Sequence, residues 1–134
     1  MFGTSYPNRA SAYARVGNQT SVESASPHKL ILMLYDGALL ALGTATVAMQ
    51  NKDIPTKGKS ISKAIDIIMN GLKVSLDIEA GGELAERLDA LYEYMADRLL
   101  HGNLHNNQAA IEEVIGLLGS LREAWAAIES QVQG

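Results

Sequence analysis

The sequence predicts an all-α protein, an antiparallel up-down-up-down four-helix bundle preceded by a mobile N-terminal arm. Apolar residues recur every three or four positions in four successive segments, which is the period of a helix with one buried face. Short runs rich in Pro, Gly, Asn and Asp separate these segments. Aromatic residues make up only 5% of the 134 residues, so the core must be built largely from aliphatic side chains. Short connections between long helices favour antiparallel neighbours.

Residues 1–25 are predicted to form the arm, and residues 26–134 the bundle. The arm is rich in Ser, Asn, Gly and Thr, and we expect at most one short helix in it, near residues 10–16. Tyr6 and Tyr13 are its candidate contact residues, and the arm is a candidate lid. Its polar start lacks the apolar stretch of a secretory signal, and the chain has no cysteine, so we expect a cytoplasmic protein.

The first two helices have clear start signals. Ser26 precedes Pro27, which predicts an N-cap followed by proline in the first helical turn, and this helix is expected to run to about residue 51. Asp53 lies shortly before Pro55 and is the predicted cap of a second helix over residues 54–80.

The last two helices are delimited by glycine and asparagine. Gly81 and Gly82 are predicted to end the second helix, because glycine readily adopts the left-handed conformation found there. A third helix is expected over residues 83–101, closed by the segment HGNLHNN. A fourth is expected over residues 107–131.

The first helix carries more apolar surface than a bundle needs. Between Lys29 and Lys52 the only charged residue is Asp36, and apolar side chains surround most of the helix. The second helix shows a second apolar stripe beside its core stripe. A soluble monomer rarely exposes a large apolar patch unless something binds there.

Three interpretations of this surplus remain open. The first helix could span a membrane, but Asp36 would then cost on the order of 2.5–3.5 kcal/mol near the bilayer centre. It could be a central helix covered by its neighbours, by the arm or by a second copy of the chain. It could line a groove that accepts amphipathic helices from a partner. The candidate groove residues are Leu30, Met33, Leu34, Gly37, Ala38, Ala41, Ile67, Gly71, Val74, Ile78 and Trp125.

The sequence contains no pattern that predicts catalysis or a cofactor. It lacks the Glu-x-x-His pairs of di-metal bundles, and phosphate-binding and nucleophile motifs are also missing. The net charge of −4 argues against general nucleic-acid binding, which needs a basic face. We therefore expect neither an enzyme nor a metal or cofactor site.

Three motifs resemble those of a known family. They are S-A-S-P-x-K-L-I-x-M-L-Y-D-G-A at residues 24–38, G-G-E-L-A-x-x-L-x-x-L-Y-x-Y-M at 81–95 and L-L-x-x-L-R-E-A-W at 117–125. In this order they are similar to the flagellin-specific secretion chaperone family, FliS. Two positions depart from the pattern: Ser24 stands where threonine is usual, and Arg87 where asparagine is common. Both departures leave the helix pattern intact.

The resemblance implies a cytoplasmic helical chaperone without catalytic activity or membrane insertion. Its client would be the disordered C-terminal segment of flagellin, which wraps around the chaperone as helices and is thereby kept from premature polymerisation. Its other partners would be an export-gate membrane protein of the flagellar type III apparatus and possible co-chaperones. The alternative is a self-associating helical adaptor whose surplus apolar face is a homodimer interface, so monomer and homodimer both stay open.

Overall fold

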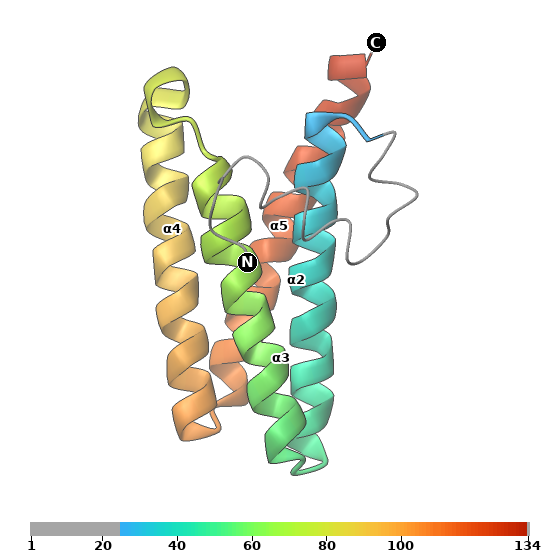
Figure 1. Cartoon of the computed structure of the whole chain (residues 1–134), viewed down its shortest axis with the longest axis vertical. Helices are drawn as coiled ribbons and strands as arrows, with labels where there is room; N and C mark the ends of the chain where they lie inside the picture. The colour runs from blue at the N-terminus through green and yellow to red at the C-terminus, as the bar shows by residue number, and fades with distance from the viewer. Residues whose placement is uncertain (1–24, 134) are drawn as a thin grey trace, which may run out of the picture.

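The computed structural model describes residues 25–133, and it is an all-α four-helix bundle (Figure 1). The predicted all-α helical bundle is confirmed. The helices are α2 (Pro27–Gln50), α3 (Ile54–Ile67), α4 (Ile78–His105) and α5 (Gln108–Gln133). A π-helical turn, η1 (Ile68–Leu72), and a 3-10 turn, η2 (Lys73–Ser75), extend α3. The predicted arm, with Tyr6 and Tyr13, lies almost wholly outside the described residues.

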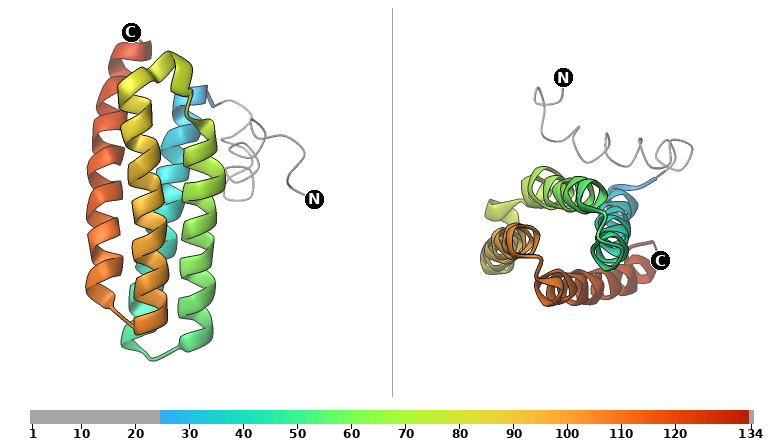
Figure 2. Two further views of the ribbon diagram at one scale, coloured as in Figure 1. Left: turned by 90° about the vertical axis from the view of Figure 1, so that its left-hand side faces the viewer. Right: turned by 90° about the horizontal axis from the view of Figure 1, so that it is seen from below.

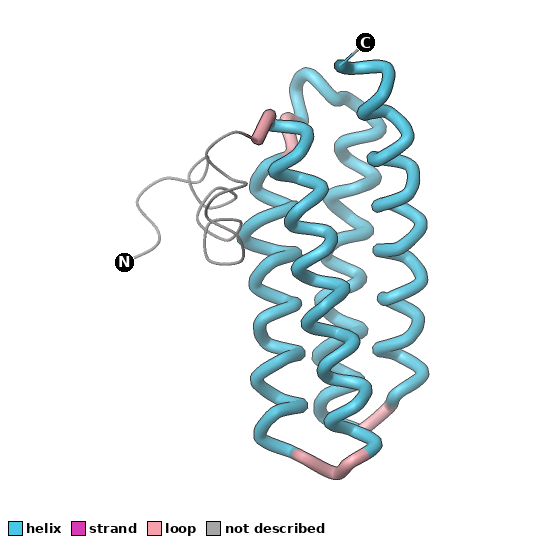
Figure 3. The backbone as a smooth tube through the Cα atoms, turned by 90° about the vertical axis from the view of Figure 1, so that its right-hand side faces the viewer, coloured by secondary structure: helices cyan, strands magenta, loops and turns pink. Residues whose placement is uncertain are grey.

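The four helices stand at the corners of a square and surround one core. Seen end-on, α2 lies beside α3 and α5, while α4 lies diagonally across from α2 (Figure 2). The connections are short and lie at the two ends of the bundle (Figure 3). All four helices contribute to the largest fully buried side chains: Leu34, Leu42, Ile61, Ile68, Leu72, Met95, Leu99, Ile111, Val114 and Leu118.

The helix starts confirm the predicted caps. The Ser26 hydroxyl accepts a hydrogen bond from the Lys29 amide at 3.1 Å, and the Asp53 carboxylate accepts one from the Thr56 amide at 3.2 Å. Each bond satisfies a backbone N–H that has no partner within the helix. These local bonds depend on neighbours three residues apart, which is why the sequence could predict them.

The predicted boundary between the second and third helices is wrong by several residues. The helical segment that begins with α3 ends at Ser75, and Asp77 caps α4 by accepting a hydrogen bond from the Ala80 amide at 3.1 Å. Ile78 therefore starts α4 and is no part of the second helix. Gly82 does adopt the expected positive φ, 55°, but it kinks α4 just after its first turn instead of ending α3.

The end of α4 also lies beyond the predicted residue 101. The helix continues through Gly102 to His105 and is closed by Asn106, which is left-handed at φ 51°. Lys57 of α3 is only 5% exposed, and its ammonium donates to the Asn103 carbonyl at 3.0 Å and to the Asn106 side chain at 2.5 Å. Carbonyls at a helix end carry partial negative charge, so this contact stabilises the last turn of α4.

A pair of tyrosines crosses the core between α2 and α4. The hydroxyls of Tyr35 and Tyr92 are 2.6 Å apart, and the two residues are 3% and 2% exposed. Burial raises the pKa of both phenols above its ordinary value, so both stay neutral at physiological pH. Each hydroxyl is the hydrogen-bond partner of the other, which offsets the cost of burying both.

We expect Tyr35→Phe to lower the free energy of unfolding by about 1–3 kcal/mol, because it leaves the Tyr92 hydroxyl buried without this hydrogen bond. The double variant Tyr35→Phe, Tyr92→Phe should be closer to wild type than the sum of the two single variants. Urea unfolding of all four proteins measures this coupling. Additive effects would show that the two hydroxyls do not depend on each other.

Candidate functional site

The exposed side of α2 presents an uncharged apolar surface, which we call the α2 outer face and define as Leu40, Gly43, Thr44 and Val47. Leu40 is 74% exposed and Val47 is 54% exposed. The four residues are spaced three and four apart, so they share one side of the helix. A helix that only completes a bundle usually carries charged side chains on this side, and α2 carries none here.

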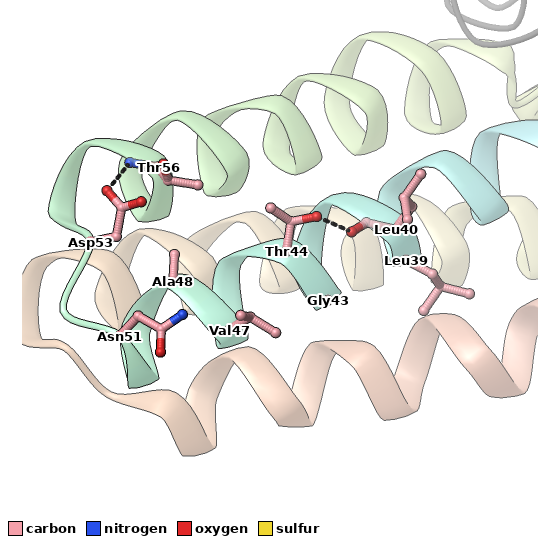
Figure 4. Close-up of a pocket in the computed structure, with 9 residues that line it drawn as sticks. All are labelled: Leu39, Leu40, Gly43, Thr44, Val47, Ala48, Asn51, Asp53 and Thr56. Carbon is pink, nitrogen blue, oxygen red and sulfur yellow. Dashed lines mark hydrogen bonds between the residues drawn. The ribbon is translucent and has the colours of Figure 1, made fainter.

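A shallow open hollow of about 500 Å³ overlies this face and extends to the start of α3 (Figure 4). Its lining residues are Leu39, Leu40, Gly43, Thr44, Val47, Ala48, Asn51, Asp53 and Thr56. The Thr44 hydroxyl donates to the Leu40 carbonyl at 3.1 Å, so this polar group is already satisfied within the helix. A side chain on Gly43 would meet nothing within 4 Å, so a partner can approach the backbone there.

Charged residues mark the two ends of the α2 outer face. At one end Asp36 accepts a hydrogen bond from the Arg122 guanidinium of α5, with Nε at 2.7 Å from the carboxylate. At the other end Lys52 and Asp53 form the turn into α3. At a rise of about 1.5 Å per residue, the uncharged part of the helix is about 22 Å long. This length suits a partner helix of about four turns.

Five of the predicted groove residues are buried, and for them the groove prediction is corrected. They are Leu34, Ala38, Ala41, Ile67 and Gly71. The contact between α2 and α3 explains the burial: Ile67 Cδ1 lies 3.5 Å from the point where a side chain on Gly37 would begin. Gly37 of α2 therefore lies against a side chain of this chain's own α3, and the second apolar stripe of α3 is core where Ile67 lies.

The other predicted residues lie at the edges of the core. Leu30, Met33, Gly37 and Val74 are partly buried, and Ile78 is 40% exposed but belongs to α4, away from α2. Trp125 is also partly buried and joins the end of α5 to the start of α2. Its indole N–H donates to the His28 carbonyl at 2.9 Å, and its ring stacks on the His28 ring at a centroid distance of 4.6 Å.

Leu40 and Val47 were absent from the predicted groove. Their apolar character is plain in the sequence, but almost every neighbour is apolar too, so the pattern does not tell the outer side of this helix from the inner one. The absence of charged residues between Asp36 and Lys52 indicates that the helix has surplus apolar surface. It does not indicate on which side of the helix that surface lies.

Within residues 25–133, α2 is the one helix long and apolar enough to cross a membrane by length and composition. The core helix of a soluble bundle passes the same test. Leu34, Ala38 and Leu42 of α2 are buried in the shared core. One side of α2 packs into a core formed by all four helices. We therefore interpret α2 as a core helix with an apolar outer face.

Comparisons with known proteins agree on one family. The family model described as flagellar protein FliS matches residues 9–132. The flagellar secretion chaperone FliS of Salmonella typhimurium is 54% identical over 117 residues, covering 87% of each chain. The Escherichia coli protein of the same name is 50% identical over 85% of this chain and 84% of its own, and FliSB of Pseudomonas aeruginosa is 45% identical over 87% and 91%. This chain therefore belongs to the FliS family of flagellar secretion chaperones.

Proposed function

We propose that this protein is a cytoplasmic export chaperone whose client is the disordered C-terminal segment of flagellin. The α2 outer face is the observation that carries the proposal. It is apolar, uncharged over about four helical turns, and has an open hollow beside it. Amphipathic helices are recognised by grooves of this kind, through apolar residues spaced three and four apart.

The proposed mechanism is coupled folding and binding. A disordered client loses conformational entropy when it becomes helical, and burial of its apolar side against Leu40 and Val47 must offset that loss. While it is held in this way, the client segment is not available for assembly into a filament. The chaperone then delivers the bound client to the membrane protein of the export gate, and a co-chaperone can assist it.

The client proposal is tested by isothermal titration calorimetry of the full-length protein with a synthetic peptide of the last ~40 residues of the flagellin from the same organism. We expect one-to-one binding with Kd below about 1 μM and a clearly negative heat-capacity change, because apolar surface is buried. A peptide of the same composition in scrambled order, which lacks the apolar spacing, is the control. Equal binding of the two peptides, or no binding at several temperatures, would contradict the proposal.

A further inference from the structure

Two histidines lie together on the last two turns of α4. His101 is partly buried and His105 is exposed, and the centroids of their rings are 4.6 Å apart. The sequence predicts that the helix ends at residue 101, and in that case the two side chains would not share a helix face. In the structure α4 continues through His105, so the two residues have the regular spacing of neighbours on one face of a helix.

The hydrogen bonds around His101 show the state of one of its ring nitrogens. Asn107 caps α5, and its side-chain oxygen accepts from the Ala110 amide at 3.2 Å. Its side-chain nitrogen therefore points the other way and lies 3.3 Å from His101 Nε2. Because an amide nitrogen only donates, Nε2 is the acceptor and presents a lone pair. This is the form in which a histidine nitrogen binds a metal ion, and a hydrogen bond this long is readily replaced.

The charges around the pair favour a cation. The last turn of α4 carries the partial negative charge of a helix C-terminus, and Asp97 is exposed one turn before His101. Arg98 also lies near, but its guanidinium forms an ion pair with Glu113 of α5 at 2.9 Å, which reduces its repulsion of another cation. Lys57 reaches this turn from the buried side, where backbone and side-chain oxygens bind its ammonium.

Other imidazole or thiolate ligands are scarce in this chain. Its 134 residues include three histidines and no cysteine. The third histidine, His28, is 8% exposed, and its ring stacks on Trp125 and contacts the Trp125 carbonyl through Nε2 at 2.7 Å. Among the described residues, no three side chains of His, Asp or Glu form a group that could hold a metal ion. An ion bound by His101 and His105 would therefore keep water as its remaining ligands.

We propose that His101 and His105 form a surface site for a divalent late transition-metal ion, namely Cu²⁺, Ni²⁺ or Zn²⁺. Two histidines four residues apart on one helix face are a known zinc-binding arrangement. Imidazole nitrogens bind such ions at about 2.0–2.1 Å, which places two of them about 3 Å from each other, and the separation of the rings allows this. Cu²⁺ should bind most tightly of the three.

The bound ion would link two successive turns and so stabilise the end of α4. Two protein ligands make an exchangeable site, unlike a structural zinc site, which takes four. The pair lies on α4, diagonally across the bundle from the α2 outer face (Figure 2). Metal binding is therefore independent of the proposed client site.

Isothermal titration calorimetry of the full-length protein, without a histidine tag, tests the site with each metal chloride alone. We expect one ion per chain, with Kd on the order of 10 μM for Cu²⁺ and weaker binding of Ni²⁺ and Zn²⁺. His101→Gln and His105→Gln should each weaken Cu²⁺ binding about tenfold or more. Absence of binding, or equal binding by wild type and both variants, would overturn the proposal.

A relocated histidine distinguishes chelation by the pair from binding to a single imidazole. The double variant His105→Gln, Ala90→His keeps three histidines and two of them on α4, at an exposed position eleven residues from His101. At a rise of about 1.5 Å per residue the two are about 16 Å apart and cannot share an ion. This variant should bind Cu²⁺ like His105→Gln. Binding like wild type would show that the ion needs no histidine pair. Far-UV circular dichroism shows that the helices are intact.

Thermal melts and NMR test where the ion lies. At a free concentration of about ten times Kd, Cu²⁺ should raise the Tm of the wild type by about 2–5 °C and leave that of His105→Gln nearly unchanged. In ¹H–¹⁵N spectra, paramagnetic Cu²⁺ should broaden the amide signals of residues 97–108 first. Broadening centred on another part of the chain, such as the acidic start of α4 at Glu79, Glu83 and Glu86, would overturn the proposal.

Discussion

Replacing Ile67 with aspartate is expected to unfold most of the protein. Ile67 is 3% exposed and packs between α3 and α2, with its Cδ1 3.5 Å from where a side chain on Gly37 would begin. An aspartate there would bury a carboxylate in an apolar core, at a cost of about 4 kcal/mol or more. Since a domain of this size is stable by roughly 5–15 kcal/mol, the loss removes a large part of the total. Far-UV circular dichroism and a thermal melt measure it.

Ser62→Asp is the control for this substitution. Ser62 lies on the same helix but is exposed, so an added carboxylate there stays in water and should change the free energy of unfolding by less than about 0.5 kcal/mol. If Ile67→Asp melted like wild type, Ile67 would be a surface residue. The prediction that it lines a client groove would then stand.

The helices could be predicted from the sequence because their signals are local. Ser26 and Asp53 each cap a helix through an amide only three residues away, so the pattern and the bond involve the same few residues. The inner side of α3 and its extension η1 is predictable as well, because Ile61, Ala64 and Ile68 repeat with the helix period among polar neighbours, and all three are buried.

The exposed side of α2 could not be predicted in the same way. Leu34 is 1% exposed and Leu40 is 74% exposed, yet both are leucines in an almost continuous apolar segment. A periodic pattern locates a buried face only when polar residues mark the opposite side. The packing of α3 and α5 against α2 therefore decides which leucine faces outward. These contacts join residues far apart in the sequence, so the local pattern does not contain them.

The segment from Ser75 to Gly82 shows a second limit. Asp77 is a helix-start residue and Gly82 is a helix-end residue, so the sequence offers two places for one boundary. The structure uses both: Asp77 caps α4, and Gly82 kinks it one turn later. The prediction rests on the glycine alone, and for this reason it assigns Ile78 to the wrong helix.

Leu40→Asp is expected to weaken binding of the flagellin peptide about a hundredfold while the fold remains intact. Leu40 is 74% exposed in the free protein, so the change removes no core contact. In the complex, however, it would remove the burial of a leucine, roughly 1.5–3 kcal/mol, and would place a charge against the apolar side of the client. A loss of about 2.7 kcal/mol corresponds to a hundredfold change in Kd. Calorimetry with the same peptide measures it.

Leu104→Asp serves as the matched control for client binding, because it introduces the same charge at an exposed leucine on α4. It should bind the peptide like wild type. Loss of binding in Leu104→Asp with none in Leu40→Asp would move the client site to α4.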